Sequence, residues 1–340
     1  MEKYLDRCLS SLIVDSATMS QMEVLVINDG STDNSSEIAR KYEHRFPFTF
    51  RVIDKENGHY GSCINAGLLI ASGKYIKILD SDDWFQGENI PSYLAFLNDN
   101  DFDMVLSDAL IMQTDGVIKR RASFSFSKKG VISLNNFNPA DYQVIQHHNL
   151  AYRTNLLKQI AYKQTEGISY TDLEWIVKPL VAVSKAGYFN EVVYVYERGR
   201  EDQSVAPSIH SKNMWMENKV VLGLSRYYEE VKMDNKSKNL GTISGIVVSF
   251  IDRIYWHYLV NIPKLLDNRQ LISFDRQLKD ISEELYEKVS RAEDKRKFMT
   301  LKYVRQWRLF KSRNTPVFWL YDIGRSIGYT LRKVIVPAIF

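Results

Sequence analysis

The first half of the chain alternates short apolar runs with longer stretches in which apolar residues recur every three or four positions. The apolar runs are rich in β-branched residues and predict strands, at 23–28, 50–53, 75–79 and 103–107. The amphipathic stretches predict helices, at about 4–12, 34–42, 61–72 and from 91 onward. Strands that alternate with helices are typical of βαβ units, so we predict an α/β fold with a doubly wound, mostly parallel sheet.

The second half follows a different pattern. Residues 187–196 predict a turn followed by an extended segment, and the chain becomes helical from about Asn213. The sequence has no internal repeat and no low-complexity linker between its halves. We therefore predict two regions, an α/β domain at 1–210 and a helical C-terminal region at 211–340.

Composition and charge narrow the class of protein. A net charge of +4 over 340 residues is small, so the chain is not expected to bind nucleic acid. Its two cysteines, Cys8 and Cys63, belong to no CxxC pair, which argues against a disulfide framework or a cysteine zinc site and fits a reducing cytoplasm. No apolar run reaches the roughly 18 residues of a membrane span, and the N-terminus has no signal-peptide core. We expect a protein that stays inside the cell.

Three aspartates follow the predicted strand at 75–79, within Asp80-Ser81-Asp82-Asp83. Carboxylates this close together repel each other, which costs stability unless a cation neutralises them. Mg²⁺ or Mn²⁺ binds carboxylate oxygens together with substrate phosphates, so this run is a candidate metal site. The alternative is a solvated acidic turn before the next helix.

Two further polar clusters follow predicted strands. Asp29 ends the strand at 23–28, where ligands of doubly wound sheets bind, and its carboxylate can accept a hydrogen bond from a nucleotide base or ribose. Asn57 and Gly58 precede a helix start, where backbone N–H groups can approach a phosphate. Each cluster has a simpler alternative, because Asp-Gly and Asn-Gly also form ordinary turns.

The order and spacing of these clusters resemble the family 2 glycosyltransferases, which have the GT-A fold. The likeness is carried by EVLVINDGSTDNS and ENGHYGSCINAGLLIASGKYIKILDSDDWF, within 23–85. A weaker likeness continues through EGISYTDLEW at 166–175 and VVYVYERGREDQS at 192–204. The resemblance implies an inverting enzyme that moves a hexosyl or N-acetylhexosaminyl group from a nucleotide-diphosphate sugar. The expected donor is a UDP-sugar. The acceptor would be a glycan or polyprenyl-linked molecule in surface polysaccharide synthesis.

The resemblance also implies roles for individual residues. Asp29 would bind the base or ribose, together with Asn57 and Gly58 as nucleotide contacts. Asp80 and Asp82 would be the two ends of a DXD motif, with Asp80 facing the ribose and metal and Asp82 binding the metal on the diphosphate. The catalytic base would be Asp172. It would deprotonate an acceptor hydroxyl, which attacks the anomeric carbon from the face opposite the leaving group and inverts its configuration.

From the residues alone, the identity of the base stays open. A base needs only a carboxylate within reach of the proton, and three are available, at Glu166, Asp172 and Glu174. Asp172 could instead cap the helix that follows it. His147 and His148 are candidate acceptor contacts. If they lie on a strand, at most one of them faces the site, because adjacent side chains point apart.

The segment at 194–203 offers further polar and aromatic side chains. Tyr194 and Tyr196 would share one strand face and are expected in the core rather than under a sugar. Arg198, Arg200 and Gln203 follow. A cation there could hold the leaving diphosphate, and an exposed charged loop is the alternative.

The chain departs from the family pattern at its beginning. Family members normally begin with an apolar strand that ends in Pro-x-Tyr-Asn, whereas this sequence starts at Met1 in the helix that follows. We expect the first strand, a central one, to be missing from the sheet, which would expose unpaired backbone groups. A protein that starts at Met1 should bind donor poorly, and an upstream strand should restore stability and nucleotide binding.

Basic residues are concentrated near the C-terminus. From 302 to the end the chain has eight Lys and Arg residues against one acid, Asp322. Aromatic and apolar residues alternate with them, at 307, 310, 318, 319, 321, 327 and 329. A basic and aromatic amphipathic helix favours binding at an anionic membrane surface, which would place the protein at the inner face of the cell membrane. The alternative is a packed helical subdomain with a solvated basic face.

Two other functions remain compatible with these residues. The chain could bind a nucleotide sugar without turning it over, as a scaffold protein. It could also be a sugar nucleotidyltransferase, which would need a glycine-rich phosphate loop with a basic residue after the first strand. That region lies upstream of the segments matched here.

Overall fold

The structure is a computed structural model that describes residues 1–126, 128–235, 237–291, 303–316, 318–320 and 322–323. The chain divides into two compact units. The first, which we call the sheet unit, comprises residues 1–206 and 231–245. The second, the helical unit, comprises residues 207–230 and 246–340.

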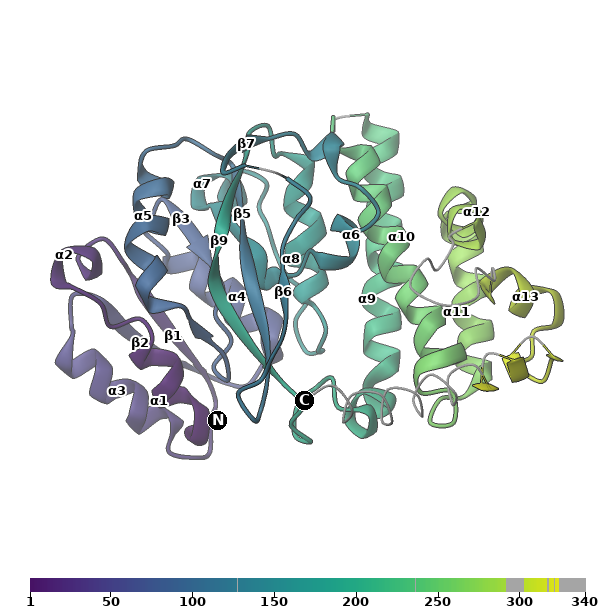
Figure 1. The fold of residues 1–340 in the computed structure, drawn as a ribbon, viewed down its shortest axis with the longest axis horizontal. Coiled ribbons are helices and arrows are strands. Elements are labelled where there is room, and N and C mark those ends of the chain that lie inside the picture. The colour runs from purple at the N-terminus through teal and green to yellow at the C-terminus, as the bar shows by residue number, and fades with distance from the viewer. Residues whose placement is uncertain (127, 236, 292–302, 317, 321, 324–340) are drawn as a thin grey trace, which may run out of the picture. The chain divides into compact units, whose positions relative to one another are not determined.

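The sheet unit begins with a pair of parallel strands flanked by helices (Figure 1). The elements of this part are α1 (Glu2–Ser10), α2 (Ser16–Met19), β1 (Val24–Asp29), α3 (Ser35–Arg45), β2 (Phe50–Lys55) and α4 (His59–Ile70). Helix α1 packs on α3, and α4 packs on β1. The apolar stripe predicted for the first helix is buried, since Leu5 and Leu9 join Phe50 of β2 in one core cluster.

Strand β1 is hydrogen-bonded along one edge. It pairs with β2 in parallel, with Val24 opposite Phe50 and Asp29 opposite Lys55. Within the described residues, no strand pairs with its other edge, and all six of its residues are partly exposed. Among the described strands, this two-stranded sheet is thus separate from the larger sheet. The effect on donor binding stays a prediction.

The larger sheet has seven strands, in the order β3-β8-β5-β9-β4, with β6 beside β5 and β7 beside β9. Their bounds are β3 (Tyr75–Lys77), β4 (Trp84–Phe85), β5 (Met104–Gln113), β6 (Ile118–Ala122), β7 (Gly130–Ile132), β8 (Leu150–Arg153) and β9 (Ala186–Arg198). Strands β5 and β9 run parallel, while the other pairs are antiparallel. The α/β class is confirmed, but the sheet is mixed rather than mostly parallel. The difference arises because tight connections such as the β5–β6 hairpin reverse the chain direction.

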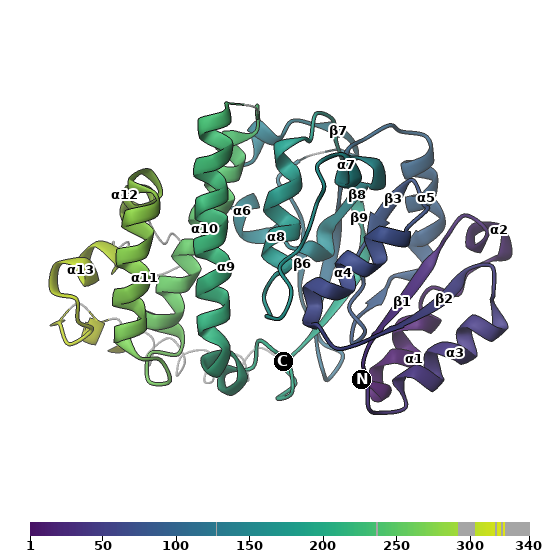
Figure 2. The same ribbon diagram turned by 180° about the vertical axis from the view of Figure 1, so that it is seen from behind.

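Short helical segments connect these strands. They are η1 (Gly87–Asn89), α5 (Ile90–Asn98), η2 (Leu134–Asn136), α6 (Asp141–Val144), η3 (His147–Asn149), α7 (Thr154–Gln159), α8 (Asp172–Val177) and η4 (Lys178–Val181). Figure 2 shows α4 and α8 on the side of the sheet that faces the viewer there. The core lies at β5 and β9, where Phe102 packs so closely on Gly187 that a Cβ there would lie 2.6 Å from its ring. The turn η3 packs on both strands and is therefore held by the core.

The helical C-terminal region is confirmed. Its elements are α9 (Pro207–Asp234), α10 (Leu240–Trp256), a π-helical turn η5 (His257–Asn261), α11 (Asn268–Ile281), α12 (Glu283–Arg291) and α13 (Tyr303–Phe310). Asp275 of α11 binds Arg308 of α13, whose Nε lies 2.8 Å from Oδ1, and Lys311 just after α13, whose Nζ lies 2.5 Å from Oδ2. The hydroxyl of Tyr255 donates to the same Asp275 carboxylate at 2.5 Å. None of the helices in the described residues combines the length and hydropathy that a membrane span requires.

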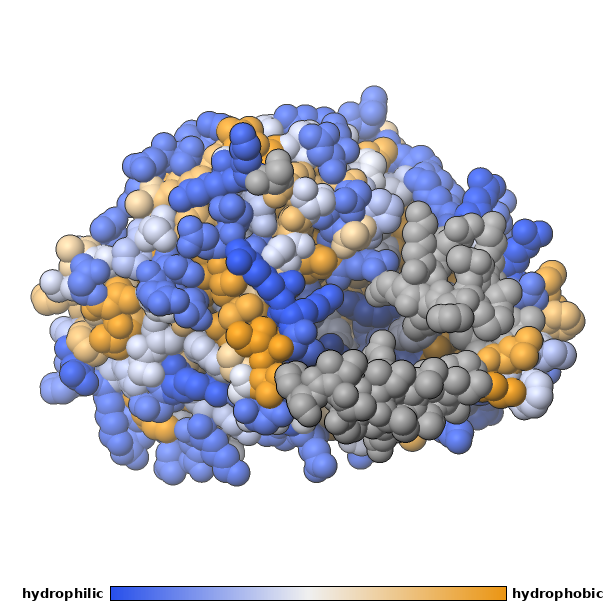
Figure 3. All heavy atoms as spheres, viewed as in Figure 1, coloured by the Kyte–Doolittle hydropathy of each residue, from blue (hydrophilic) through white to orange (hydrophobic). Residues whose placement is uncertain are grey.

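The described part of the basic tail is divided between core and surface. Trp307 and Phe318 have no exposed surface, as expected for a packed subdomain. Leu309, Phe310 and Trp319 are exposed instead, and Figure 3 shows apolar side chains at the surface near α13. Several tail residues of the membrane hypothesis lie outside the described residues, namely Lys302, Tyr321, Arg325, Ile327, Tyr329, Arg332 and Lys333.

Candidate functional site

The loop after β3 carries the predicted carboxylates, and two of them are neutralised by cations. Oδ2 of Asp80 lies 3.0 Å from Nε2 of His147. Asp82 forms an ion pair with Arg200, which follows β9. Side chains from distant segments therefore relieve part of the repulsion that the sequence indicates.

The third carboxyl, Asp83, is buried and hydrogen-bonded to its neighbours. It accepts hydrogen bonds from the hydroxyl of Tyr194 at 2.7 Å and from the backbone N–H of Glu197 at 3.0 Å. Burial, together with the negative charges of Asp80 and Asp82, raises the pKa of Asp83 to about 8. Tyr194 is fully buried, as expected, and its hydrogen bond to Asp83 supports the loop.

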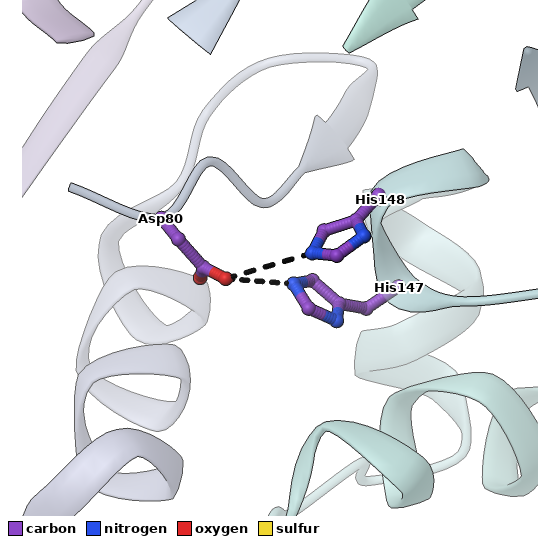
Figure 4. Close-up of side chains that lie close together, drawn as sticks. All are labelled: Asp80, His147 and His148. Carbon is purple, nitrogen blue, oxygen red and sulfur yellow. Dashed lines mark hydrogen bonds and ion pairs between the residues drawn. The ribbon is translucent and has the colours of Figure 1, made fainter. Parts of the chain in front are cut away.

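Both predicted histidines point at Asp80 (Figure 4). They lie on the 3₁₀ turn η3 rather than on a strand, so neighbouring side chains are not forced to opposite faces. Nε2 of His148 lies 3.7 Å from the Asp80 oxygen that His147 binds. The expectation that at most one histidine faces the site is therefore wrong, because it assumed a strand.

The two histidines differ in charge. Burial by itself lowers the pKa of His147, but the neighbouring Asp80 and Asp172 raise it to about 10. Burial and the positive charge of His147 lower the pKa of His148 to about 4. Burial would raise the pKa of Asp80, but the His147 charge holds it below its ordinary range. At neutral pH the cluster thus combines an ionised Asp80, a cationic His147 and a neutral His148.

His147 also connects Asp80 to the candidate base. Its Nδ1 lies 3.6 Å from Oδ2 of Asp172, which is an ion-pair distance rather than a hydrogen bond. Asp172 is the first residue of α8, and the N-cap position belongs to Thr171. Asp172 therefore does not cap the helix, and its carboxylate faces the histidine cluster.

The other two candidate bases are occupied in structural contacts. Glu166 accepts a hydrogen bond from the side-chain amide of Asn65 at 2.7 Å. Glu174 is buried and accepts from the backbone N–H and the hydroxyl of Thr165, at 2.6 and 2.8 Å. Both glutamates hold the 164–167 loop. Of the three carboxylates, the ion-pair contact with the cluster is made by Asp172.

Asp29 lies at the end of β1 in its own set of contacts. Oδ1 accepts from Nζ of Lys55 at 2.6 Å, from the backbone N–H of Gly58 at 3.0 Å and from the hydroxyl of Ser62 at 3.3 Å. Burial opposes ionisation, but these partners lower the pKa of Asp29. The side-chain amide of Asn57 donates to the backbone oxygen of Asp29 at 2.9 Å. The predicted nucleotide contacts Asp29, Asn57 and Gly58 are thus brought together.

The first turn of α4 connects Asp29 to the histidine cluster. Gly58, at its N-cap, donates to Asp29, and the ring of Tyr60 lies edge-on to His147 with centroids 6.0 Å apart. Contacts from this one turn thus reach both Asp29 and the ring of His147.

The loops that form this region are conformationally constrained. His59 and Tyr170 both adopt left-handed backbone angles, with φ of 64°. Such strain in non-glycine residues concentrates at functional sites. Gly61 approaches the backbone oxygen of Thr165 so closely that a Cβ would lie 2.0 Å from it, so only glycine fits there.

Two arginines support the acidic loop, and no sequence pattern pointed to the first of them. Arg7 of α1 donates from Nη2 to the backbone oxygen of Asp82 at 3.1 Å and stacks on the ring of Trp84 at 3.9 Å. Its Nη1 lies 2.7 Å from Glu197, which also binds Nη1 of Arg200 at 2.9 Å. A lone arginine on a surface helix carries no motif, so only the fold could reveal Arg7.

The residues after β3 fit a divalent cation. The side chains of Asp80 and Asp82 are 25% and 22% exposed and can be reached from solvent. Ligand atoms of Asp80, His147 and His148 all lie within 4.8 Å of one another. Carboxylate oxygens suit Mg²⁺ and Mn²⁺, and the imidazole nitrogens shift the preference toward Mn²⁺. A cation on Asp82 would have to displace Arg200.

Sequence comparison relates the chain to known proteins. Residues 1–161 match the profile of the family described as Glycosyl transferase family 2. The poly(ribitol-phosphate) β-N-acetylglucosaminyltransferase TarS of Staphylococcus aureus is 26% identical over 206 residues, which cover 60% of this chain and 35% of TarS. The minor teichoic acid biosynthesis protein GgaB of Bacillus subtilis is 25% identical over 250 residues, covering 70% of this chain and 26% of GgaB. The chain thus spans about a third or less of the length of these relatives.

Structure comparison extends over nearly the whole chain. A crystal structure of TarS 1–349 in complex with UDP-GlcNAc matches with a TM-score of 0.65 at 18% identity, covering 92% of this chain and 85% of that one. The complex of the same TarS fragment with UDP gives a TM-score of 0.64 at 19% identity. These matches confirm the predicted GT-A fold.

Proposed function

We propose, from the match of residues 1–161 to Glycosyl transferase family 2, that the chain transfers a sugar from a nucleotide-diphosphate sugar to a glycan or lipid-linked acceptor. The observation that carries this proposal is the position of His147, which lies between Asp80 of the acidic loop and Asp172 at the start of α8. Two carboxylates that are 92 positions apart in sequence, one suited to a metal and one suited to a base, are thereby held in one cluster.

The donor is proposed to be a UDP-sugar with a hexosyl or N-acetylhexosaminyl group. TarS, which shares the fold, has been crystallised with UDP-GlcNAc and with UDP. In this chain Asp29 would bind the base or ribose, with Asn57 and Gly58 beside it. The N-terminal turn of α4 offers backbone N–H groups next to this position, which favours negative charge on a ligand.

Asp80 and Asp82 would hold Mg²⁺ or Mn²⁺. A divalent ion there supplies positive charge to the diphosphate leaving group and so eases cleavage of the sugar–phosphate bond. Arg200, released from Asp82, would be left beside the same phosphates, where a guanidinium can bind two oxygens at once.

Asp172 would act as the base of an inverting transfer. Its carboxylate would accept the proton of the acceptor hydroxyl as that oxygen attacks the anomeric carbon, and the nucleotide diphosphate would leave from the opposite face. Cationic His147 lies 3.6 Å away and would orient the Asp172 carboxylate. His147 and neutral His148 form the side of the cluster that we assign to the acceptor.

We assign the reacting groups to residues 1–210. The proposed acceptor is a polymer of the cell surface. TarS is a poly(ribitol-phosphate) glycosyltransferase and GgaB is a minor teichoic acid biosynthesis protein, which favours an acceptor of this chemistry. Residues 211–340 would form the helical region that presents the enzyme to that acceptor.

Peripheral attachment to the inner face of the cell membrane belongs to the same proposal. The exposed apolar side chains of Leu309, Phe310 and Trp319 lie near the basic Arg305 and Lys311 in sequence. The protein should float with anionic liposomes, and the double substitution Phe310→Ser and Trp319→Ser should reduce the floated fraction. Equal flotation with neutral and anionic vesicles would remove this part of the proposal.

A donor panel tests the proposed function. Nucleotide sugars are screened with Mn²⁺ by thermal shift, because a ligand that binds only the folded state raises the melting temperature. Donors that bind are then incubated with acceptor polymer, and the anomeric configuration of the product is read by NMR. We expect transfer with inversion, strongly reduced in Asp172→Asn and retained by the exposed control Asp99→Asn. Binding without transfer would favour the alternative, a non-catalytic nucleotide-sugar-binding protein.

A further inference from the structure

A second polar cluster is buried in the helical unit and is made only of that unit's residues. His210 and Glu217 lie seven positions apart on α9, which places them on the same helix face two turns apart. Nε2 of His210 lies 2.6 Å from Oε2 of Glu217, and both side chains are less than a tenth exposed. His257, at the start of η5, packs its ring perpendicular to that of His210, with centroids 4.4 Å apart.

The partners of this cluster orient it. Arg253 of α10 places Nε and Nη2 each 3.0 Å from Oε1 of Glu217, so the carboxylate divides its two oxygens between Arg253 and His210. The amide of Asn261, at the end of the same π-helical turn, lies 3.0 Å from Nδ1 of His257. Partners of this kind fix the orientation of metal ligands in known sites.

The third residue of the cluster, His257, lies on an unusual turn. A π-helical turn is rare and is frequently found at functional sites, and here it carries both His257 and Asn261.

We propose that His210, Glu217 and His257 form a binding site for a transition-metal ion of the Zn²⁺ class. One ligand atom from each of the three lies within 4.8 Å of the others. Two imidazole nitrogens and one carboxylate oxygen are the ligand set of many three-residue zinc sites, whereas Mg²⁺ prefers oxygen ligands. This site shares no residue with the one proposed to hold the donor's cation.

Arg253 explains how the cluster can exist with or without an ion. Its side chain is 37% exposed, whereas Glu217 is 3% exposed. The guanidinium balances the buried carboxylate when no ion is bound, and it can move toward solvent when a divalent cation brings positive charge to Glu217. Bound metal would join α9 to the turn that follows α10.

Zinc binding by the full chain tests the proposal. After treatment with EDTA, the protein is dialysed against Zn²⁺ and the bound metal is counted by elemental analysis. His257→Gln, which keeps an amide beside Asn261, should bind one Zn²⁺ fewer per chain than the wild type. Its zinc affinity at this site should fall by at least about 10-fold, since loss of a partner that only orients a ligand already costs on the order of 10–100-fold. The matched control is His44→Gln, at an exposed position of α3. Equal zinc content in His257→Gln and the control would overturn the proposal.

A second variant distinguishes a metal site from a structural ion-pair network. Arg253→Met removes the guanidinium and leaves Glu217 buried without its cation, so the melting temperature without metal should fall. If the site binds Zn²⁺, the metal should then raise the melting temperature of Arg253→Met by more than it raises that of the wild type. An Arg253→Met protein that is destabilised and unaffected by Zn²⁺ would show that the three residues form only an ion-pair network.

Discussion

Replacing Arg200 with methionine should tighten the binding of Mn²⁺ to the chain in the absence of nucleotide. Arg200 forms an ion pair with Asp82, the carboxylate proposed to bind the metal, and its guanidinium lies over the ring of Tyr4 at 4.2 Å. A Mn²⁺ ion that binds Asp82 must therefore compete with the guanidinium of Arg200. Methionine retains much of the packing volume and removes the charge, so the competition is lost.

The size of the effect follows from the burial of the pair. The side chains of Arg200 and Asp82 are 9% and 22% exposed, so the pair is partly shielded from water. Two unit charges about 4 Å apart attract by about 4 kcal/mol at an effective dielectric constant of about 20. Desolvation and side-chain ordering offset most of this and leave about 1–2 kcal/mol. Because 1.4 kcal/mol corresponds to about tenfold in affinity, Mn²⁺ should bind about 5- to 30-fold more tightly.

Titration calorimetry with Mn²⁺ measures this change directly. The matched control is Arg198→Met, which removes an exposed arginine two positions away and should leave Mn²⁺ affinity unchanged. Arg200→Met should also weaken UDP binding in the presence of Mn²⁺, because the guanidinium is proposed to contact the diphosphate. If Arg200→Met binds Mn²⁺ no more tightly than the wild type, Asp82 is not the metal ligand and the assignment of the acidic loop is wrong.

Three further predictions concern catalysis, pH and stability. Asp172→Asn should lower kcat by about 10²–10⁴-fold with UDP affinity unchanged, and turnover close to the wild-type value in a transfer assay would exclude Asp172 as the base. Because the folded-state pKa of Asp29 is lowered from its ordinary 3.8, its contribution to stability is present above that pH and is lost as the pH falls below it. Urea unfolding curves should therefore show a shallower acid loss of stability in Asp29→Asn than in the wild type, and superimposable pH profiles would contradict this. Asp275→Asn leaves Arg308 buried without its anion and should lower the free energy of unfolding by about 3 kcal/mol, whereas a change below about 1 kcal/mol in the same assay would mean that the network contributes little.

The features that the sequence predicts well are local ones. The short strands and the carboxylates that end them are encoded within a few residues, which is why Asp29 and the Asp80–Asp83 run could be placed at strand ends. The helical C-terminal region likewise follows from periodicity. Such local signals also carry the family resemblance.

The features that the sequence could not predict depend on distant partners. The predicted strand at 103–107 extends to Gln113 because Asp108, which interrupts the apolar run, is buried against Arg121 and Tyr188 at 2.7 and 2.6 Å. The pairing of Asp82 with Arg200 joins positions that are 118 residues apart. No local pattern encodes such contacts.

The histidine pair illustrates how a local signal can be overlooked. Gln146 and Asn149 flank the two histidines and close the turn reciprocally, and the side chain of Asn149 accepts from the backbone N–H of Gln146 at 3.1 Å. A Gln-His-His-Asn sequence could have indicated a capped turn instead of a strand. The turn places both rings on Asp80, and this geometry supports the proposed cluster.

The central claim is that Asp29 and the acidic loop form one site for a nucleotide diphosphate and its cation. Titration calorimetry of UDP tests it most directly, on the wild type with Mn²⁺, on the wild type with EDTA, and on Asp29→Ala and Asp82→Asn with Mn²⁺. We predict that UDP binds with Mn²⁺ and that EDTA or either substitution weakens binding by at least about tenfold, or 1.4 kcal/mol. UDP binding of equal affinity in all four titrations would contradict the account.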